Sequence, residues 1–227
     1  MKRIVFILVA LLISVTSMSA QDFNCTDAKG RRQGVWRDYY PNGQLRYEGR
    51  FKNDKCKGIF RYYDEQGNLK AVNEFDKSGD RAFNETYAPN GRVVATGFYL
   101  NQKKDGEWKY FDAASGQLRM VEDNKAGKVD GWSKLYNPEN GVLAEETQFV
   151  EGFPEGSCRK YSDTGIMIME CHYHNGLLDG PAKTYYPSSA LKEEGQYAEG
   201  KKVGTWKTYN EEGDVIAEDA FGEQEIQ

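Results

Sequence analysis

A β-hairpin is predicted by the residues Gly34-Val35-Trp36-Arg37-Asp38-Tyr39-Tyr40-Pro41-Asn42-Gly43-Gln44-Leu45-Arg46-Tyr47-Glu48-Gly49. Two runs that contain aromatic rings flank the turn residues Pro41, Asn42 and Gly43. An Asn-Gly pair between such runs favours a type I′ turn, because both of its residues accept a positive φ. The stretch therefore predicts two antiparallel strands joined by a two-residue loop at Asn42 and Gly43.

The same unit recurs eight times along the chain, at intervals of 24 or 25 residues. The small residues that open the copies are Gly34, Gly58, Ala82, Gly106, Gly131, Gly156, Gly180 and Gly204. The two longer copies carry their extra residue before the turn glycine, where a hairpin tolerates an insertion. Stacked hairpins of this kind predict an all-β fold, an elongated single-layer antiparallel meander of about sixteen strands.

Side chains alternate across a strand, so the turn decides which residues share a face of the sheet. A two-residue loop at Asn42 and Gly43 places Trp36 opposite Gly49 and Tyr40 opposite Leu45. The Trp36 ring is then expected to pack over Gly49, its cross-strand glycine. The residues predicted on this packing face of the first copy are Trp36, Tyr40, Leu45, Tyr47 and Phe51.

The opposite face is predicted to carry an aromatic ladder with carboxylates beside it. The predicted binding residues are Tyr39, Tyr63, Tyr87, Tyr136, Tyr161, Tyr185 and Tyr209, with Glu48, Glu146, Glu170, Glu194 and Glu218. Tyrosine is an amphipathic anchor at interfaces, so one interpretation is an extended surface for a partner. The alternative is that these tyrosines only stabilise neighbouring strands through cross-strand contacts.

The N-terminus has the layout of a signal peptide, with a cationic start, an apolar run from Ile4 to Val15 and small residues up to Ala20. A transmembrane anchor is the alternative, but a bilayer core requires about 20 apolar residues. Cleavage after Ala20 or Ser19 would export the chain to the periplasm or the extracellular space.

The chain carries a net charge of −5, with 30 Lys and Arg against 35 Asp and Glu. Loss of Lys2 and Arg3 with the signal peptide makes the mature chain more acidic. An acidic chain is a poor ligand for nucleic acid, whose binding depends on neutralised phosphates. It is equally unsuited to simple electrostatic docking on anionic lipid.

The four cysteines are permissive for disulfides in an exported chain. A two-residue loop at Thr164 and Gly165 places Cys158 directly opposite Cys171, at a separation that suits a disulfide. Cys25 and Cys56 are a possible second pair by exclusion. Their strands are predicted to lie a repeat apart.

No pattern in the sequence predicts an enzyme or a cofactor. There is no glycine-rich phosphate loop and no zinc motif, and two histidines give no convincing triad. Glu170, His172 and His174 alternate along one predicted strand and form at most a partial metal site. We therefore expect no metal, no cofactor and no catalysis.

The repeat resembles the bacterial variant of the MORN repeat, on the residues Gly34 to Gly49 and again at Gly204-Thr205-Trp206-Lys207-Thr208-Tyr209. The resemblance extends from about Gly30 to Phe221, with the largest departures in copies three and seven. It implies single-layer hairpin arrays, secretion from bacteria, and binding of protein or phospholipid. Some members carry the label of antitoxin in a toxin-antitoxin pair.

The resulting organisation is a signal peptide over 1–20, an N-terminal cap segment over 21–33, eight repeats over 34–221 and a polar tail over 222–227. We expect a secreted scaffold that binds an unknown protein through the face of tyrosines and glutamates. Two further hypotheses are an antitoxin or immunity protein that sequesters a toxin, and a binder of phospholipid head groups or cell-wall glycans.

Overall fold

The computed structural model describes residues 23–222, which form one antiparallel sheet of eighteen strands. This confirms the predicted all-β array of hairpins. Within the described residues no helix is long and apolar enough to cross a membrane. The predicted signal peptide and all but the first residue of the predicted tail lie outside the described range.

The strands follow one another in the sheet in chain order. They are β1 (Cys25–Thr26), β2 (Arg32–Tyr39), β3 (Leu45–Lys52), β4 (Lys55–Tyr63), β5 (Leu69–Phe75), β6 (Arg81–Tyr87), β7 (Val93–Leu100), β8 (Lys103–Phe111), β9 (Leu118–Lys125), β10 (Lys128–Tyr136), β11 (Leu143–Val150), β12 (Phe153–Tyr161), β13 (Met167–His174), β14 (Leu177–Leu178), β15 (Gly180–Tyr185), β16 (Leu191–Ala198), β17 (Lys201–Tyr209) and β18 (Val215–Phe221). Eighteen strands replace the expected sixteen, because β1 is added at the start and the short β14 precedes β15.

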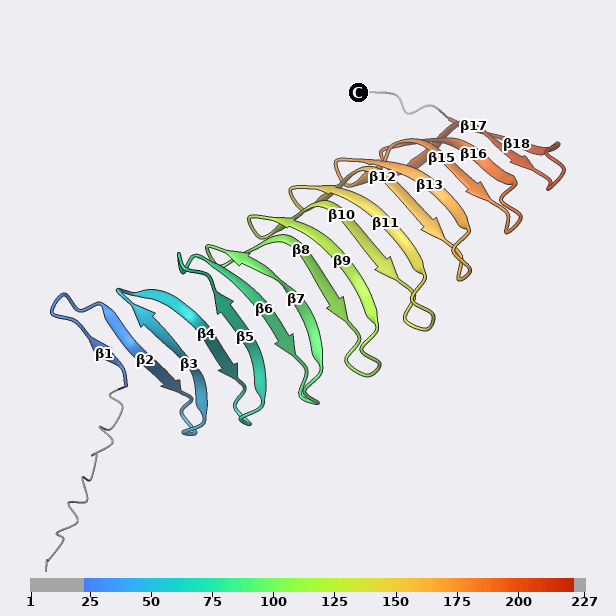
Figure 1. Ribbon diagram of the computed structural model, residues 1–227. Helices are drawn as coiled ribbons and strands as arrows, with labels where there is room; N and C mark the ends of the chain where they lie inside the picture. Colours follow the sequence, from blue (N-terminus) through green and yellow to red (C-terminus); the bar gives the residue numbers. More distant parts are fainter. Residues whose placement is uncertain (1–22, 223–227) are drawn as a thin grey trace, which may run out of the picture.

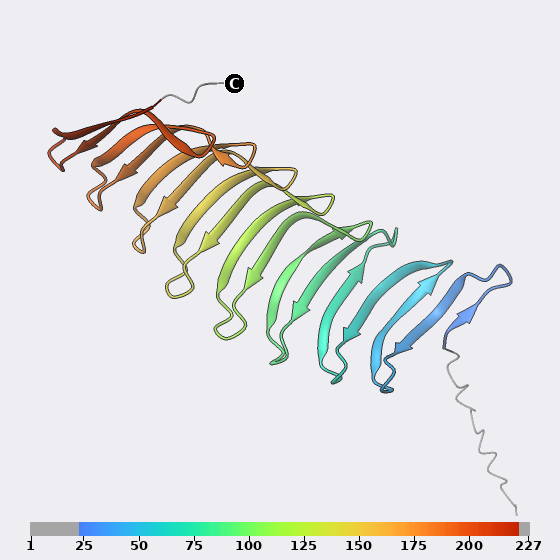
Figure 2. The same ribbon diagram turned by 180° about the vertical axis from the view of Figure 1, so that it is seen from behind.

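The sheet is a single layer whose strands bow along their length (Figure 1). The turns within the hairpins lie along one edge and the loops between the hairpins along the other. The view from behind shows that no other part of the described chain covers either face (Figure 2). Both faces of the sheet are therefore open to a partner over the whole array.

The hairpin turns are wider than predicted. The N–H of Tyr40 donates to the carbonyl of Gln44 and that of Gly43 to the carbonyl of Tyr40, and Gly43 has a positive φ while Asn42 does not. The prediction of a type I′ turn was therefore wrong, since that turn requires a positive φ at both residues. The side chain of Asn42 instead accepts a hydrogen bond from the N–H of Gln44. An irregularity beside the turn pairs Tyr39 with Leu45, where Tyr40 was expected.

The register beyond that irregularity is the predicted one, because the extra residue is absorbed next to the turn. Trp36 pairs with Gly49 as expected, and Cys158 pairs with Cys171. The irregularity recurs beside the turns of the other hairpins, for example at Tyr161 and Met167. The disulfide was therefore predicted correctly although the turn type was not, because the register beyond the turn is unchanged.

Most pairs of strands that connect one repeat to the next contain a β-bulge. The glycine that opens such a repeat makes this bulge possible. Between β7 and β8 the pairing jumps from Thr96–Lys109 to Phe98–Asp105, and Gly106 in the bulge has a φ of +73°. Glycine reaches this left-handed region without the steric cost that a side chain imposes. The junction of β5 and β6 has Ala82 in the glycine position, and its ladder is regular throughout.

Three buried rings of the core each lie over a glycine of the preceding repeat. An added Cβ at Gly97 would lie 2.3 Å from the ring of Trp108, which is only 2% exposed. Phe60 covers Gly49 and Trp206 covers Gly195 in the same way. The expectation that Trp36 covers Gly49 of its own hairpin was wrong, because the bulge moves the next repeat's ring over that glycine.

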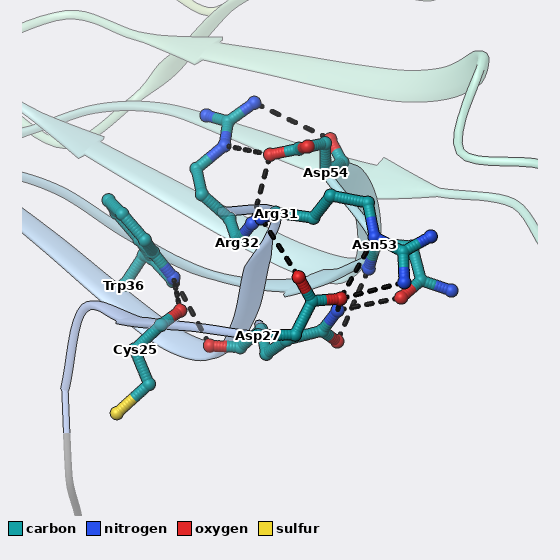
Figure 3. A network of polar contacts seen from close by, with 8 residues as sticks. Cys25, Asp27, Arg31, Arg32, Trp36, Asn53 and Asp54 are labelled. Carbon is teal, nitrogen blue, oxygen red and sulfur yellow. Dashed lines mark hydrogen bonds and ion pairs between the residues drawn. The ribbon is translucent and has the colours of Figure 1, made fainter. Parts of the chain in front are cut away.

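A network of polar contacts ties the N-terminal segment to the first repeats (Figure 3). The indole N–H of Trp36 donates to the carbonyl of Cys25. The carboxylate of Asp54 accepts hydrogen bonds from the backbone and the guanidinium of Arg32. The segment before the first repeat is therefore part of the sheet, and Arg32 is held at its edge.

Candidate binding hollow and the tyrosine face

A hollow of about 930 Å³ lies on the core face of the first three repeats. Its lining residues come mainly from strands β3 to β7, which lie side by side in the blue to green part of Figure 1. This is the face that the sequence predicted to serve packing alone. Because the sheet has one layer, the same face is also accessible from outside.

The floor of the hollow is polar at a position where the first, second, fourth and eighth repeats have a ring: Trp36, Phe60, Trp108 and Trp206. Asn84 occupies the position of Trp108 and is 3% exposed. Its amide nitrogen donates to Oδ1 of Asn73 at 2.6 Å, and the hydroxyl of Thr86 donates to its Oδ1 at 2.9 Å. The amide pair satisfies a buried polar floor but fills much less space than an indole.

Aromatic side chains form the walls. Phe60 is buried and stacks against Tyr62 with ring centroids 6.4 Å apart, and it meets Phe75 edge to face at 5.2 Å. Tyr99 stands on the other side of the floor, in contact with Trp108. Burial raises the pKa of Tyr62 above its usual value. Its hydroxyl therefore stays neutral at physiological pH and acts in hydrogen bonds.

The charges of the lining are unevenly distributed. At the loop end Arg32 pairs with Asp54 at 3.0 Å and Lys55 with Asp80 at 3.2 Å, so these charges neutralise each other. The hydrogen bonds from the backbone and guanidinium of Arg32 hold the pKa of Asp54 below its usual value. This end of the hollow is thus closed by two ion pairs.

The turn end of the hollow is cationic. Lys70 is exposed and has no carboxylate partner within ion-pair distance in the described part of the chain. Arg46 pairs with Asp38 at 3.2 Å, but their side chains are 58% and 43% exposed. A pair exposed to this degree contributes little and exchanges its partner readily.

Cys56 also lines the hollow, near its loop end. It is a free, partly buried cysteine, and burial raises the pKa of its thiol. A neutral thiol is a weak nucleophile, so Cys56 adds apolar surface rather than reactivity. The possible pairing of Cys25 with Cys56 is not formed, because β2 and β3 separate their strands.

The predicted tyrosine and glutamate residues of the last repeats meet each other on the opposite face. The hydroxyl of Tyr161 donates to Glu146 at 2.9 Å, that of Tyr185 to Glu170 at 2.6 Å, and that of Tyr209 to Glu194 at 2.7 Å. Each bond joins a tyrosine to the glutamate of the preceding repeat. This ladder accounts for both residue types without a ligand.

These hydrogen bonds shift the ionisation of the tyrosines. Burial and the bond to the Glu170 carboxylate raise the pKa of Tyr185 to about 12. Glu146 also pairs with Arg159 at 3.0 Å and with Lys134 at 4.0 Å, so its charge is shared among three partners. The functional groups of this part of the face are directed at one another.

The other predicted residues of this face have different surroundings. Tyr39 is 52% exposed, Glu48 pairs with Arg37 at 3.4 Å, and the hydroxyl of Tyr87 donates to Glu85 of its own strand. Glu218 lies on the exposed strand β18 and pairs with Lys207 at 3.8 Å. Tyr63 and Tyr136 are partly buried, and Tyr63 also lines the hollow.

The two histidines do not converge with Glu170. Glu170 is bonded to Tyr185, whereas His174 bonds to Glu155 at 2.9 Å at the loop edge of the sheet. That bond raises the pKa of His174. Within residues 23–222 no group of three His, Cys, Asp or Glu side chains is arranged to hold a metal ion.

Cys158 and Cys171 form a disulfide with their Cα atoms 5.1 Å apart, as predicted. They are 1% and 2% exposed. Cys158 occupies the position that Asn84 has in copy three, and Cys171 occupies that of Gly97, the partner of Asn84 within its hairpin. The disulfide packs with Ala182 and Trp206 in a small cluster. Its role in the structure is to fill the core row of repeat six.

The hollow was not predicted from the sequence, although copy three departs from the repeat at Ala82 and Asn84. At the junction of β5 and β6 the missing ring leaves an open space, because no second layer covers the face of the sheet. Departures from a repeat are therefore a better guide to a site than its constant residues.

A family model described as the MORN repeat variant matches residues 32–53 and 178–199. The chain carries MORN-variant repeats. The two matches lie in the first and the seventh copies of the unit, so the family likeness extends to both halves of the array. The antitoxin label implied by the resemblance gains no support from this match.

The chain is similar to two solved structures only at a low level. It aligns with TarM at a TM-score of 0.31 and 17% identity, over 40% of this chain and 18% of TarM, so it spans less than a fifth of that structure. The TCP10 domain of Danio rerio CPAP, in complex with a peptide of Danio rerio STIL, aligns at 0.29 and 14% identity, over 87% of this chain and 98% of that one. These TM-scores carry no inference. The comparison with curated proteins found no match.

Proposed function

We propose that the MORN-variant array is a non-catalytic, exported scaffold that binds another protein through an open face of its sheet. The observation that carries this proposal is the uncovered hollow of about 930 Å³, with its aromatic walls and polar floor. Aromatic residues around a few placed polar groups are typical of recognition sites. The N-terminal signal predicted from the sequence supports export.

The two faces of the array offer different surfaces to a protein partner. The core face holds the hollow, in which lining rings such as Tyr62 and Tyr99 are only partly buried. The opposite face holds the tyrosine ladder, whose hydroxyl groups in repeats six to eight are bonded to glutamates of the preceding repeats. The hollow is the better candidate because its groups face open space.

The test is partner capture by crosslinking, with the mature chain 21–227 as bait in an extract of the secreting cells. A hollow variant carries Tyr62→Ala and Tyr99→Ala, and a matched ladder variant carries Tyr136→Ala and Tyr161→Ala. We expect the wild type and the ladder variant to recover the same protein, and the hollow variant to lose it. Circular dichroism checks that both variants keep their strands.

The result also discriminates between the alternatives. Loss of the partner in the ladder variant alone would move the interface to the tyrosine face, and a captured toxin would give the scaffold an antitoxin role. Cosedimentation with phospholipid vesicles or peptidoglycan, without any protein partner, would overturn the proposal in favour of lipid or glycan binding.

A further inference from the structure

We infer that the hollow binds an acidic peptide segment that carries an aromatic side chain, with the ring on the floor and the carboxylates at the turn end. The inference rests on the proposed function, since it names the chemistry of the protein segment that the scaffold would bind. Three features carry it: the space left by a missing ring, the surplus of positive charge and the extent of the lining.

The space over the floor matches an aromatic side chain. At the junction of β7 and β8 the ring of Trp108 lies over Gly97 and meets Tyr99 with centroids 4.9 Å apart. At the junction of β5 and β6 the same position holds Asn84, and the walls Phe60 and Phe75 remain. A ring supplied by the partner takes the place of the missing one and packs against these walls.

The charge of the lining is opposite to that of the chain. The lining contains four cationic and two anionic side chains: Arg32, Arg46, Lys55 and Lys70, with Asp54 and Asp80. The chain as a whole carries −5. Both aspartates of the lining are paired at the loop end. At the turn end Arg46 has only an exposed pair with Asp38, which lies outside the lining, and Lys70 has no carboxylate partner among the described residues.

Carboxylates of the peptide complement this cationic end. Lys70 gains a partner, and Arg46 exchanges its exposed pair with Asp38 for a carboxylate that the hollow partly shields from water. Hydrogen bonds between charged groups are stronger in such surroundings than on an open surface. The acidic surface outside the hollow repels a peptide that lies elsewhere, so complementary charge also selects the site.

The lining spans five neighbouring strands, from β3 to β7. At a spacing of about 4.8 Å between strands this distance is about 19 Å, which an extended peptide of about six residues covers. The side-chain amides of Asn101 and Gln102 also line the hollow. They are suited to hydrogen bonds with the peptide backbone.

The experiment measures fluorescence anisotropy with three labelled hexapeptides on the mature chain. The acidic probe is fluorescein-Gly-Glu-Trp-Glu-Phe-Glu, and Gln or Lys replaces every Glu in the neutral and basic probes. We expect the acidic probe to bind at least about tenfold more tightly than the basic probe, and its affinity to fall as salt rises. An acidic probe with Ala in place of Trp and Phe is expected to lose its affinity.

The decisive variant is Arg46→Glu with Lys70→Glu, which is expected to reverse the preference from the acidic to the basic probe. The matched control, Lys125→Glu with Lys128→Glu, makes the same change of charge on exposed residues outside the hollow and is expected to keep the wild-type preference. The two substitutions in the hollow affect exposed side chains, and a thermal melt of each variant verifies its fold.

Equal binding of the three probes, or a preference that survives the reversal of charge, would overturn the inference. Binding to vesicles of phosphatidylserine and phosphatidylcholine that requires Arg46 and Lys70, with no binding of the acidic probe, would also overturn it. If crosslinking captures a partner through the hollow but no probe binds, the scaffold function stands and this assignment of its ligand fails.

Discussion

The junctions β5–β6 and β7–β8 solve the same packing problem in different ways. At β7–β8 the glycine bulge brings Trp108 over Gly97, and the indole N–H donates to the carbonyl of Phe98 at 3.0 Å. At β5–β6 there is no bulge, and Asn84 pairs directly with Asn73. The first junction is filled by a ring, and the second is the floor of an open hollow.

The difference teaches that, in this single layer, the side chains that face each other at a junction decide whether the face is filled there or left open. The ring of Trp108 buries itself against its neighbours Tyr99 and Tyr110 on the same face. The amide of Asn84 at the same position forms a hydrogen bond with Asn73 on the neighbouring strand and leaves the space above it open. Repeat six shows a third solution, in which the disulfide fills the position.

Trp108→Ala tests the filled junction and has the largest expected effect. Removal of this ring should lower the free energy of unfolding by about 3–5 kcal/mol, because the cavity cannot be filled from a second layer. Urea unfolding followed by circular dichroism measures the loss. Gly97→Ala in the wild type is the partner variant, since its new Cβ would lie 2.3 Å from the ring.

The two substitutions should not be additive. Once Trp108 has been truncated, the methyl group of Gly97→Ala enters free space, so its cost in the double variant should be much smaller than in the wild type. If Gly97→Ala costs the same in both backgrounds, then the ring does not set the need for glycine, and the interpretation of this junction is wrong.

Asn84→Ala tests the open junction. The substitution removes the donor to Asn73 and the acceptor for Thr86, and it should cost about 1–3 kcal/mol for the polar groups left without partners. The double variant Asn73→Leu with Asn84→Leu is the control for the amide pair, because replacing both amides by apolar groups is nearly neutral, while the Thr86 hydroxyl loses its acceptor in both variants. A larger loss in the double variant would show that the amides do more than satisfy each other.

The repeats, and from them the fold, followed from the sequence, because glycine spacing and aromatic alternation are local signals. The pair Cys158 and Cys171 was found for the same reason, since register beyond the turn depends only on counting residues. The hollow could not be found in this way. Its floor lies at the junction β5–β6, whose ladder has no bulge, and the space that the side chains leave there is not encoded in the alternation of one strand.

The residues of the predicted face show a second limit. Counting placed Tyr161, Tyr185 and Tyr209 on one face with the glutamates. It did not reveal that each hydroxyl is bonded to the glutamate of the preceding repeat, because this contact requires the offset between repeats. An expected surface of free groups is, in these repeats, a chain of internal hydrogen bonds.

The smallest expected effects come from exchanging the opening residues by which the two junctions differ, glycine at β7–β8 and alanine at β5–β6. Gly106→Ala leaves the new Cβ without a neighbour within 4 Å, so its cost is that of a left-handed backbone with a side chain, about 1–2 kcal/mol.

Ala82→Gly restores the residue that most other copies have, and the repeat pattern taken alone would predict that it stabilises the protein. We expect the opposite, a loss of about 0.5–1 kcal/mol, because Ala82 lies in a regular ladder that has no bulge and glycine only adds freedom to the unfolded chain. Urea midpoints of the two variants decide between these views, and a stabilised Ala82→Gly would mean that β5–β6 forms the bulge as soon as glycine permits it.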